Sequence, residues 1–149
     1  MPILDNQTLR AIIMDHYSNP TNKKTPEDMS KYTSIHMKSD NCVDDINVFL
    51  KEENGVIVDC LWDGIACTIS TSSTDIMCDL VKGKSKDDAD KIIQNYLAMI
   101  HEEPYDPELL DEAIVFMNTS KQASRIRCAT IGWNGLKELI DDECCCHKK

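Results

Sequence analysis

The sequence lacks any long hydrophobic stretch. Its apolar runs are short and interrupted, whereas a membrane-spanning helix needs about 20 predominantly apolar residues. The first ten residues, MPILDNQTLR, contain an early aspartate and have no basic segment followed by an apolar one, the layout of a secretory signal. We therefore expect a cytoplasmic protein that does not contact a membrane.

Basic residues are also few. The 149-residue chain has 16 lysines and arginines against 26 aspartates and glutamates, which gives a formal net charge of −10. A surface with this charge repels a phosphate backbone, so the composition argues against nucleic-acid binding. It favours a protein partner that has a basic docking face.

The eight cysteines do not have the close spacing of a short zinc finger. In a reducing compartment they are not expected to form disulfides either. Metal binding, thiol chemistry and simple burial remain as explanations for them.

Pattern and turn signals predict a single α+β domain over residues 1–143, followed by a mobile tail, CCCHKK, at 144–149. Residues 44–64 alternate with a period of two and contain Asn54-Gly55, which predicts a hairpin of two strands. A further short strand or turn is expected in the GIAC stretch that follows. Periodicity and capping residues, among them Ser85 and Asp88 in the spacing of a capping box, predict the helices. These are expected over residues 4–20, 68–83, 85–103 and 124–143, with a short one within 104–120.

Three of the cysteines, Cys42, Cys67 and Cys128, lie at the edges of predicted elements. Cys67 and Cys128 are near helix starts, where unpaired N–H groups favour a thiolate. Asp44 follows Cys42 by two residues and would point the same way in an extended chain. Three thiolates and one carboxylate would suit a tetrahedral zinc site. The spacing alone favours burial of single cysteines over a shared site, because nothing local fixes the grouping.

The remaining cysteines and two of the histidines favour simpler interpretations. Cys60 and Cys78 are expected to be core side chains. Cys144, Cys145 and Cys146 are adjacent and cannot all face one ion without a contorted backbone. His16 is expected to be packed on the first helix, and His36 is a candidate for an outer contact of the site near Cys42.

Several motifs occur in an order that resembles the IscU/NifU-like iron–sulfur scaffold family, and most closely its SufU branch. They are LRAIIMDHYSNP, NCVDDI, WDGIACTISTSSTDIM, VKGKS and RIRCATIGW. Arg127 stands where the IscU type has a histidine, and residues 101–120 resemble the insertion of the SufU branch. The resemblance implies a small antiparallel three-stranded sheet with helices packed on one side, an N-terminal helix and C-terminal helices.

The resemblance also implies a zinc ion, held by Cys42, Asp44, Cys67 and Cys128, and sulfur transfer beside a SufS-type cysteine desulfurase. Cys42 would accept the sulfur. The protein would be a monomer or weak homodimer. One departure from the family pattern is Val43, where glycine is usual, and a β-branched residue stiffens this loop.

The nearby arginines, Arg125 and Arg127, would offset the charge of a released thiolate. Two alternatives remain for the whole protein: a scaffold that holds a nascent iron–sulfur cluster on the same ligands, and a zinc-stapled interaction module without thiol chemistry.

Overall fold

The computed structural model describes residues 6–39, 43–117 and 119–146. Its sheet has three antiparallel strands in the order β1-β2-β3: β1 (Thr33–Lys38), β2 (Asp45–Glu53) and β3 (Val56–Ile65). The three-stranded antiparallel sheet and the hairpin at Asn54-Gly55 are therefore confirmed. The expected place of the third strand is wrong, because GIAC ends β3 and continues into the next helix, whereas β1 precedes the hairpin. β1 escaped prediction because it is a short edge strand in which only Ile35 and Met37 are half-buried.

Strict alternation along β3 predicts that Val56, Val58, Cys60 and Trp62 share one face, and this prediction is partly wrong. A shift in register between Lys51 and Glu52 pairs Lys51 with Asp59 and Glu52 with Ile57, which leaves Val58 as an extra residue. Such a bulge changes which side chains face the core. Ile57 is consequently fully buried, whereas Val58 is 41% exposed.

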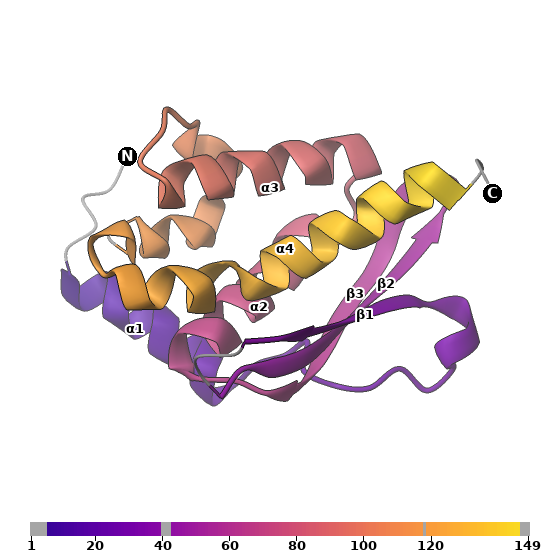
Figure 1. The fold of residues 1–149 in the computed structure, drawn as a ribbon, viewed down its shortest axis with the longest axis horizontal. Coiled ribbons are helices and arrows are strands. Elements are labelled where there is room, and N and C mark those ends of the chain that lie inside the picture. The colour runs from indigo at the N-terminus through magenta and orange to yellow at the C-terminus, as the bar shows by residue number, and fades with distance from the viewer. Residues whose placement is uncertain (1–5, 40–42, 118, 147–149) are drawn as a thin grey trace.

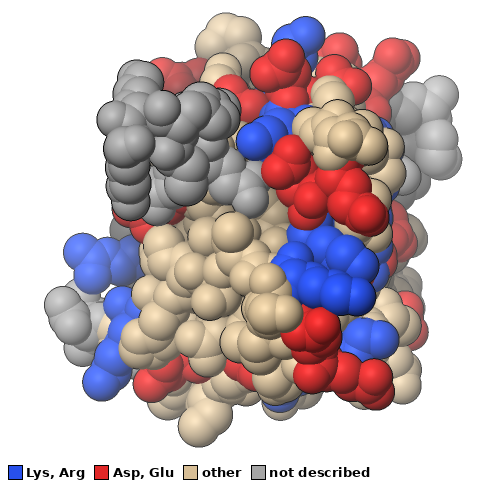
Figure 2. All heavy atoms as spheres, turned by 90° about the vertical axis from the view of Figure 1, so that its right-hand side faces the viewer, with Lys and Arg blue, Asp and Glu red and all other residues tan. Residues whose placement is uncertain are grey.

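The hairpin end of the sheet is joined to the turn before α3 (Lys86–Ile100). The amide of Ile57 donates to the carbonyl of Lys84 over 2.8 Å, and the amide of Lys86 donates to that of Gly55 over 3.0 Å. Charges of both signs lie side by side on this face (Figure 2), as in the ion pair of 3.9 Å between Lys86 and Glu52. Among the residues described at this end, neither sign of charge therefore forms a broad patch.

The helices largely follow the sequence prediction. They are α1 (Asn6–Ser18), α2 (Thr68–Val81), α3 and α4 (Ala123–Cys146), with short 3-10 helices η1 (Met29–Lys31), η2 (Pro107–Leu109), η3 (Asp111–Phe116) and η4 (Thr119–Lys121). Ser85 caps α3 as expected, since its side chain accepts from the amide of Asp88 over 3.1 Å. The backbone of α4 continues through Cys146, so the first residues of the predicted tail extend the helix, and residues 147–149 lie outside the described part. Within the described ranges, no helix combines the length and apolarity needed to cross a bilayer.

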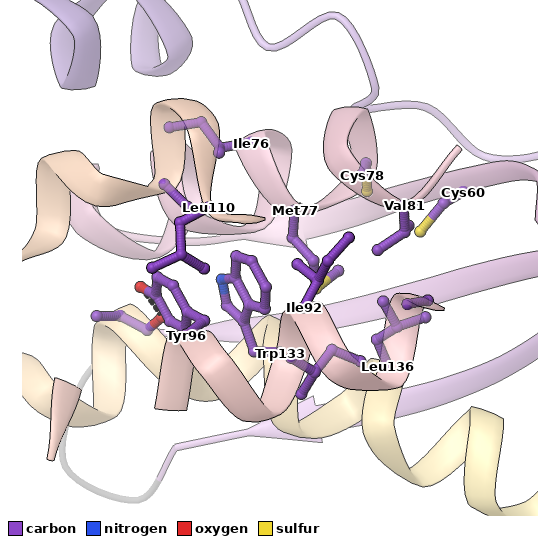
Figure 3. Packing of buried hydrophobic residues seen from close by; sticks show 14 of the residues in the cluster. Cys60, Ile76, Met77, Cys78, Val81, Ile92, Tyr96, Leu110, Trp133 and Leu136 are labelled. Carbon is purple, nitrogen blue, oxygen red and sulfur yellow. Dashed lines mark hydrogen bonds between the residues drawn. The ribbon is translucent and has the colours of Figure 1, made fainter. Parts of the chain in front are cut away.

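The core lies between the sheet and the helices on one of its sides, with α2 and α4 next to the strands and α3 outside them (Figure 1). Tyr96 of α3 stacks on Trp133 of α4 with 3.8 Å between ring centroids, next to Leu110 from the predicted insertion (Figure 3). Cys60 and Cys78 are fully buried here, as expected. Burial raises the pKa of the Cys78 thiol, which keeps it protonated and unreactive.

Candidate metal centre

Three of the four predicted ligand residues lie together in the structure. One ligand atom from each of Asp44, Cys67 and Cys128 lies within 4.8 Å of the other two. The three residues come from the loop before β2, the start of α2 and the second turn of α4, so the group is formed only by the fold. The fourth predicted ligand, Cys42, lies outside the described residues.

Asp44 is 1% exposed, and two neighbours hold its carboxylate. The Cys67 amide donates to Oδ1 over 2.9 Å, and the Ser70 hydroxyl is hydrogen-bonded to Oδ2. The backbone carbonyl of Asp44 also accepts from the Ser39 amide over 2.9 Å. A buried carboxylate needs such partners, and here they fix its position within the cluster.

Cys67 is the N-cap residue of α2, and its Sγ accepts from the amide of Ser70 over 3.4 Å. The helix end carries partial positive charge, which favours the thiolate, so the sequence correctly placed Cys67 at a helix start. Gly64 allows β3 to approach β2 just before this point. A Cβ atom there would lie 2.3 Å from the backbone carbonyl oxygen of Asp45, and so the close approach requires glycine.

Ser70 links the three clustered residues, and the sequence analysis missed it. Besides its contacts with Asp44 and Cys67, its Oγ lies 2.9 Å from the backbone carbonyl of Cys128. Ser70 is fully buried. The one available signal was the unusual run of hydroxyl side chains in α2, Ser70 to Thr74, which are all buried.

The donor set fits a zinc ion. Soft thiolates with a carboxylate are common zinc ligands, and ligand atoms at about 2.0–2.3 Å from one zinc lie roughly 3–4 Å from one another. The observed separations of at most 4.8 Å are close to this range. Cysteine thiolates also bind iron–sulfur clusters, so the donor set alone suits both kinds of centre.

The two arginines lie on different sides of α4. Arg125 lines a large groove against α1, whereas Arg127 lines a hollow of about 150 Å³ together with Ser39, beside the loop that contains Cys42 in the sequence. Among the described residues, neither guanidinium has an ion pair. The histidine candidate near this loop, His36, is exposed and bonds to Asp45, away from the three clustered residues.

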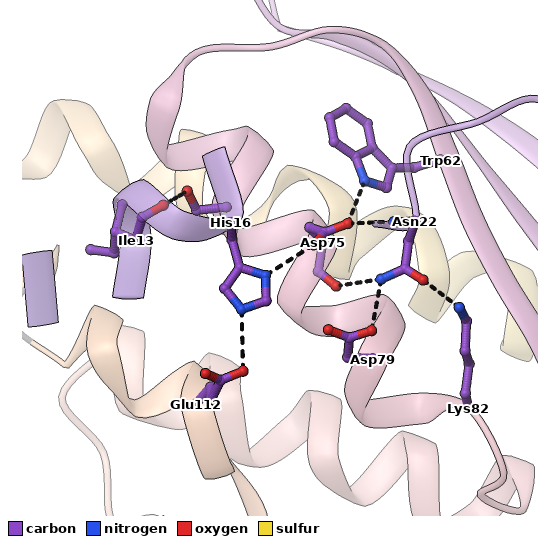
Figure 4. A network of polar contacts seen from close by, with 9 residues as sticks. Ile13, His16, Asn22, Trp62, Asp75, Asp79, Lys82 and Glu112 are labelled. Atoms are coloured by element: carbon purple, nitrogen blue, oxygen red, sulfur yellow. Dashed lines mark hydrogen bonds and ion pairs between the residues drawn. The ribbon is translucent and has the colours of Figure 1, made fainter. Parts of the chain in front are cut away.

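A second polar cluster surrounds Asp75, which is fully buried in α2 (Figure 4). His16 Nδ1 lies 2.9 Å from Asp75 Oδ2, and its Nε2 lies 3.1 Å from Glu112 Oε1. The amide of Asn22 and the indole N–H of Trp62 donate to Asp75 Oδ1 over 2.9 and 3.4 Å. His16 is thus packed, as expected, and its ring joins α1 to α2 and to η3.

Comparison with known proteins settles the family. Residues 8–137 match the profile of the NifU-like N-terminal domain. The chain belongs to this family. It is 30% identical over 135 residues to a zinc-dependent sulfurtransferase SufU from Bacillus subtilis, a match that covers 90% of each chain. It is also 32% identical over 137 residues to an iron–sulfur cluster assembly scaffold protein IscU from Streptococcus pyogenes, covering 91% of this chain and 84% of IscU.

The fold agrees with this assignment. A SufU crystal structure from Fervidobacterium islandicum AW-1 superimposes with a TM-score of 0.78 at 25% identity, over 85% of this chain and 91% of that one. The chain is therefore a SufU/IscU-like member of the family, as the motifs indicated.

Proposed function

We propose that this protein accepts persulfide sulfur from a SufS-type cysteine desulfurase during iron–sulfur cluster assembly. Cys42 is the acceptor, and Cys42, Asp44, Cys67 and Cys128 hold one zinc ion. The observation that carries the proposal is the convergence of Asp44, Cys67 and Cys128 within 4.8 Å. The likeness to a zinc-dependent sulfurtransferase SufU over 90% of the chain supports it.

The position of Cys42 in the sequence supports its role. Consecutive Cα atoms are about 3.8 Å apart, so the Cα of Cys42 lies within about 8 Å of that of Asp44. Asp44 is fixed at the cluster by its hydrogen bonds to Cys67 and Ser70. One residue, Val43, separates Cys42 from Asp44 in the sequence, so the covalent chain keeps the proposed acceptor close to the carboxylate.

In the transfer step, the Cys42 thiolate attacks the outer sulfur of the persulfide on the desulfurase. A new S–S bond forms on Cys42, the S–S bond of the donor breaks, and its electron pair leaves with the donor cysteine as a thiolate. The step needs no external oxidant or reductant. A bound zinc would keep the ligand thiols ionised at neutral pH.

The protein groups around the acceptor have separate tasks. Asp44, Cys67 and Cys128 would hold the ion while Cys42 reacts, since Ser70 and the Cys67 amide hold the three residues together. Arg127 offsets negative charge on the acceptor loop from its place beside Ser39.

A mass-spectrometric assay with the desulfurase and cysteine tests the proposal. We expect the wild-type protein to gain one sulfur atom on the peptide that contains Cys42 and to increase desulfurase turnover. Cys42→Ala should do neither. Normal turnover with this variant, or sulfur found on Cys67 or Cys128 in its place, would contradict the proposal.

A cluster scaffold is the second candidate, because the IscU relative carries that name and the same thiolates suit a cluster. Anaerobic purification separates the two functions. A brown protein with stoichiometric iron and sulfide would favour the scaffold, whereas a colourless protein with one zinc would favour sulfur transfer. A zinc-stapled interaction module, the third candidate, requires Cys42 to resist alkylation even when the desulfurase is present.

A further inference from the structure

A groove of about 810 Å³ lies between α1, the start of α2, the 3-10 helices η3 and η4, and the start of α4. Its apolar lining includes Leu9, Ile13, Ile69 and Val115. Three cationic side chains, Arg10, Lys121 and Arg125, come from three different elements and are all exposed. Neither an aspartate nor a glutamate is among the described residues that line it.

The charged side chains that line this groove are positive, whereas the chain as a whole has a negative net charge. The chain has ten more acidic than basic groups, and at the hairpin end Lys82 lies 3.6 Å from Asp59 and Lys86 lies 3.9 Å from Glu52. Within the described part of the chain, no ion pair involves Arg10, Lys121 or Arg125. Three unpaired cations around an apolar floor are complementary to a segment that has both carboxylates and apolar side chains.

The groove also borders the candidate metal centre. Thr68 and Ile69, which line it, directly follow Cys67, and Arg125 precedes Cys128 on the same helix by less than one turn. A typical protein interface covers about 800 Å² of each partner, which corresponds to a radius of roughly 16 Å. A protein that brings a persulfide to Cys42 must therefore cover neighbouring surface, and the groove lies next to the ligand-bearing helices.

We propose that this groove seats an acidic, amphipathic peptide segment of the sulfur donor, with Arg10, Lys121 and Arg125 pairing with its carboxylates. This inference rests on the function proposed above. The exposed side chain of Met14, 45% accessible at the groove, adds an apolar contact for the same segment. The groove thus fixes the orientation of the donor, while Cys42 accepts the sulfur.

Charge reversal tests the groove separately from the chemistry. The variant Arg10→Glu/Lys121→Glu leaves every candidate ligand in place. The control, Lys24→Glu/Lys84→Glu, makes the same change in net charge at exposed lysines outside the groove. The measurements are zinc content and the concentration of each protein that gives half-maximal stimulation of the desulfurase, at low and high salt.

We expect the groove variant to need at least about tenfold more protein at low salt, with an unchanged maximal rate, unchanged zinc and a weaker salt dependence. The control should behave like the wild-type protein. Equal behaviour of the two variants would overturn the groove proposal alone. A wild-type protein that fails to stimulate the desulfurase would overturn the proposed function and the groove proposal with it.

A photocrosslinker identifies the occupant directly. With Met14→p-benzoylphenylalanine, irradiation of the complex should capture a desulfurase peptide rich in aspartate or glutamate. Capture of a basic desulfurase segment, or of a second copy of this chain, would overturn the proposal.

Discussion

The amide nitrogen of Cys67 donates to Oδ1 of Asp44 over 2.9 Å, which ties the start of α2 to the loop before β2. Two candidate ligands from separate elements are thus held in place by the protein itself. Such preorganisation lowers the entropic cost of gathering ligands around an ion.

Asp44→Ala should weaken the protein even without metal. The substitution leaves the Cys67 amide without its acceptor and removes one of the two oxygen neighbours of the Ser70 hydroxyl, which is expected to lower the free energy of unfolding by about 1–3 kcal/mol. Denaturant unfolding of chelator-treated protein measures this, and elemental analysis should show zinc loss.

Ser70→Ala is the companion variant, because it keeps every ligand. We expect it to retain zinc with about 10–100-fold lower affinity, and an unchanged affinity would show that Ser70 does not orient the ligands.

Substitutions of the cysteines should fall into two groups according to whether the protein keeps its zinc. Cys67→Ser and Cys128→Ser are expected to lose zinc and the stability that zinc confers. Cys60→Ala and Cys78→Ala, at fully buried positions away from the cluster, should lower the free energy of unfolding by about 0.5–3 kcal/mol and keep the zinc. Elemental analysis with thermal unfolding checks both groups. Zinc retained by Cys67→Ser and Cys128→Ser alike would remove the basis for the metal centre.

His16 should make stability depend on pH. Burial lowers the pKa of His16, but its hydrogen bonds to Asp75 and Glu112 outweigh that effect, and the pKa lies above its usual value of 6.5. A raised pKa means that the native state binds the proton more tightly than the unfolded chain does. The contribution is therefore fully present below about pH 6.5 and is lost as pH rises through the raised pKa.

Urea unfolding between about pH 6 and pH 9 measures this contribution as the difference between the wild-type protein and His16→Gln. That difference should shrink as pH rises. His36→Gln, at an exposed histidine, is the control and should follow the wild-type curve. A difference that stays constant with pH would show that His16 is not held in its protonated form.

Gly132→Ala should be destabilising although alanine is the better helix former. An added Cβ would lie 2.4 Å from Thr74 Oγ1 and 2.9 Å from Thr74 Cγ2, where α4 crosses α2. Overpacking costs about 1–3 kcal/mol, more than the gain in helix propensity of about 1 kcal/mol. Thr74→Ala in the same chain should recover most of the loss, since Thr74 Oγ1 has no hydrogen-bond partner among the described residues.

Gly135→Ala is the matched control for this prediction. A Cβ atom added at position 135 would lie 2.9 Å from Met37 Cγ, its nearest neighbour, which belongs to a flexible side chain that can move. Chemical denaturation of the single and double variants gives the coupling energy. Equal losses at positions 132 and 135 would contradict the steric explanation.

Local signals predicted most of the fold. The hairpin turn at Asn54-Gly55, the cap at Ser85 and the helix that follows each depend on neighbours in the sequence, and they are confirmed. β1 was missed because its half-buried residues, Ile35 and Met37, pack near Gly135 of α4, which a local pattern does not record. The bulge at Val58 likewise depends on how two strands pair.

The candidate site was less accessible to local reasoning. Asp44, Cys67 and Cys128 are distant in the sequence, and their grouping came from the resemblance to a family because spacing left simple burial open. The link through Ser70 was missed because a serine in a helix has many ordinary roles. Only the packing of α2 against α4 gives this hydroxyl its neighbours.

The Ser70 hydroxyl has a single proton but two oxygen neighbours, the carboxylate of Asp44 and the main-chain carbonyl of Cys128. It can donate to only one of them at a time, either to Asp44 in the loop before β2 or to Cys128 in α4. A cation that drew electron density from the carboxylate would turn the hydroxyl toward the helix. Occupation of the metal centre would then strengthen the hydrogen bond that joins α2 to α4.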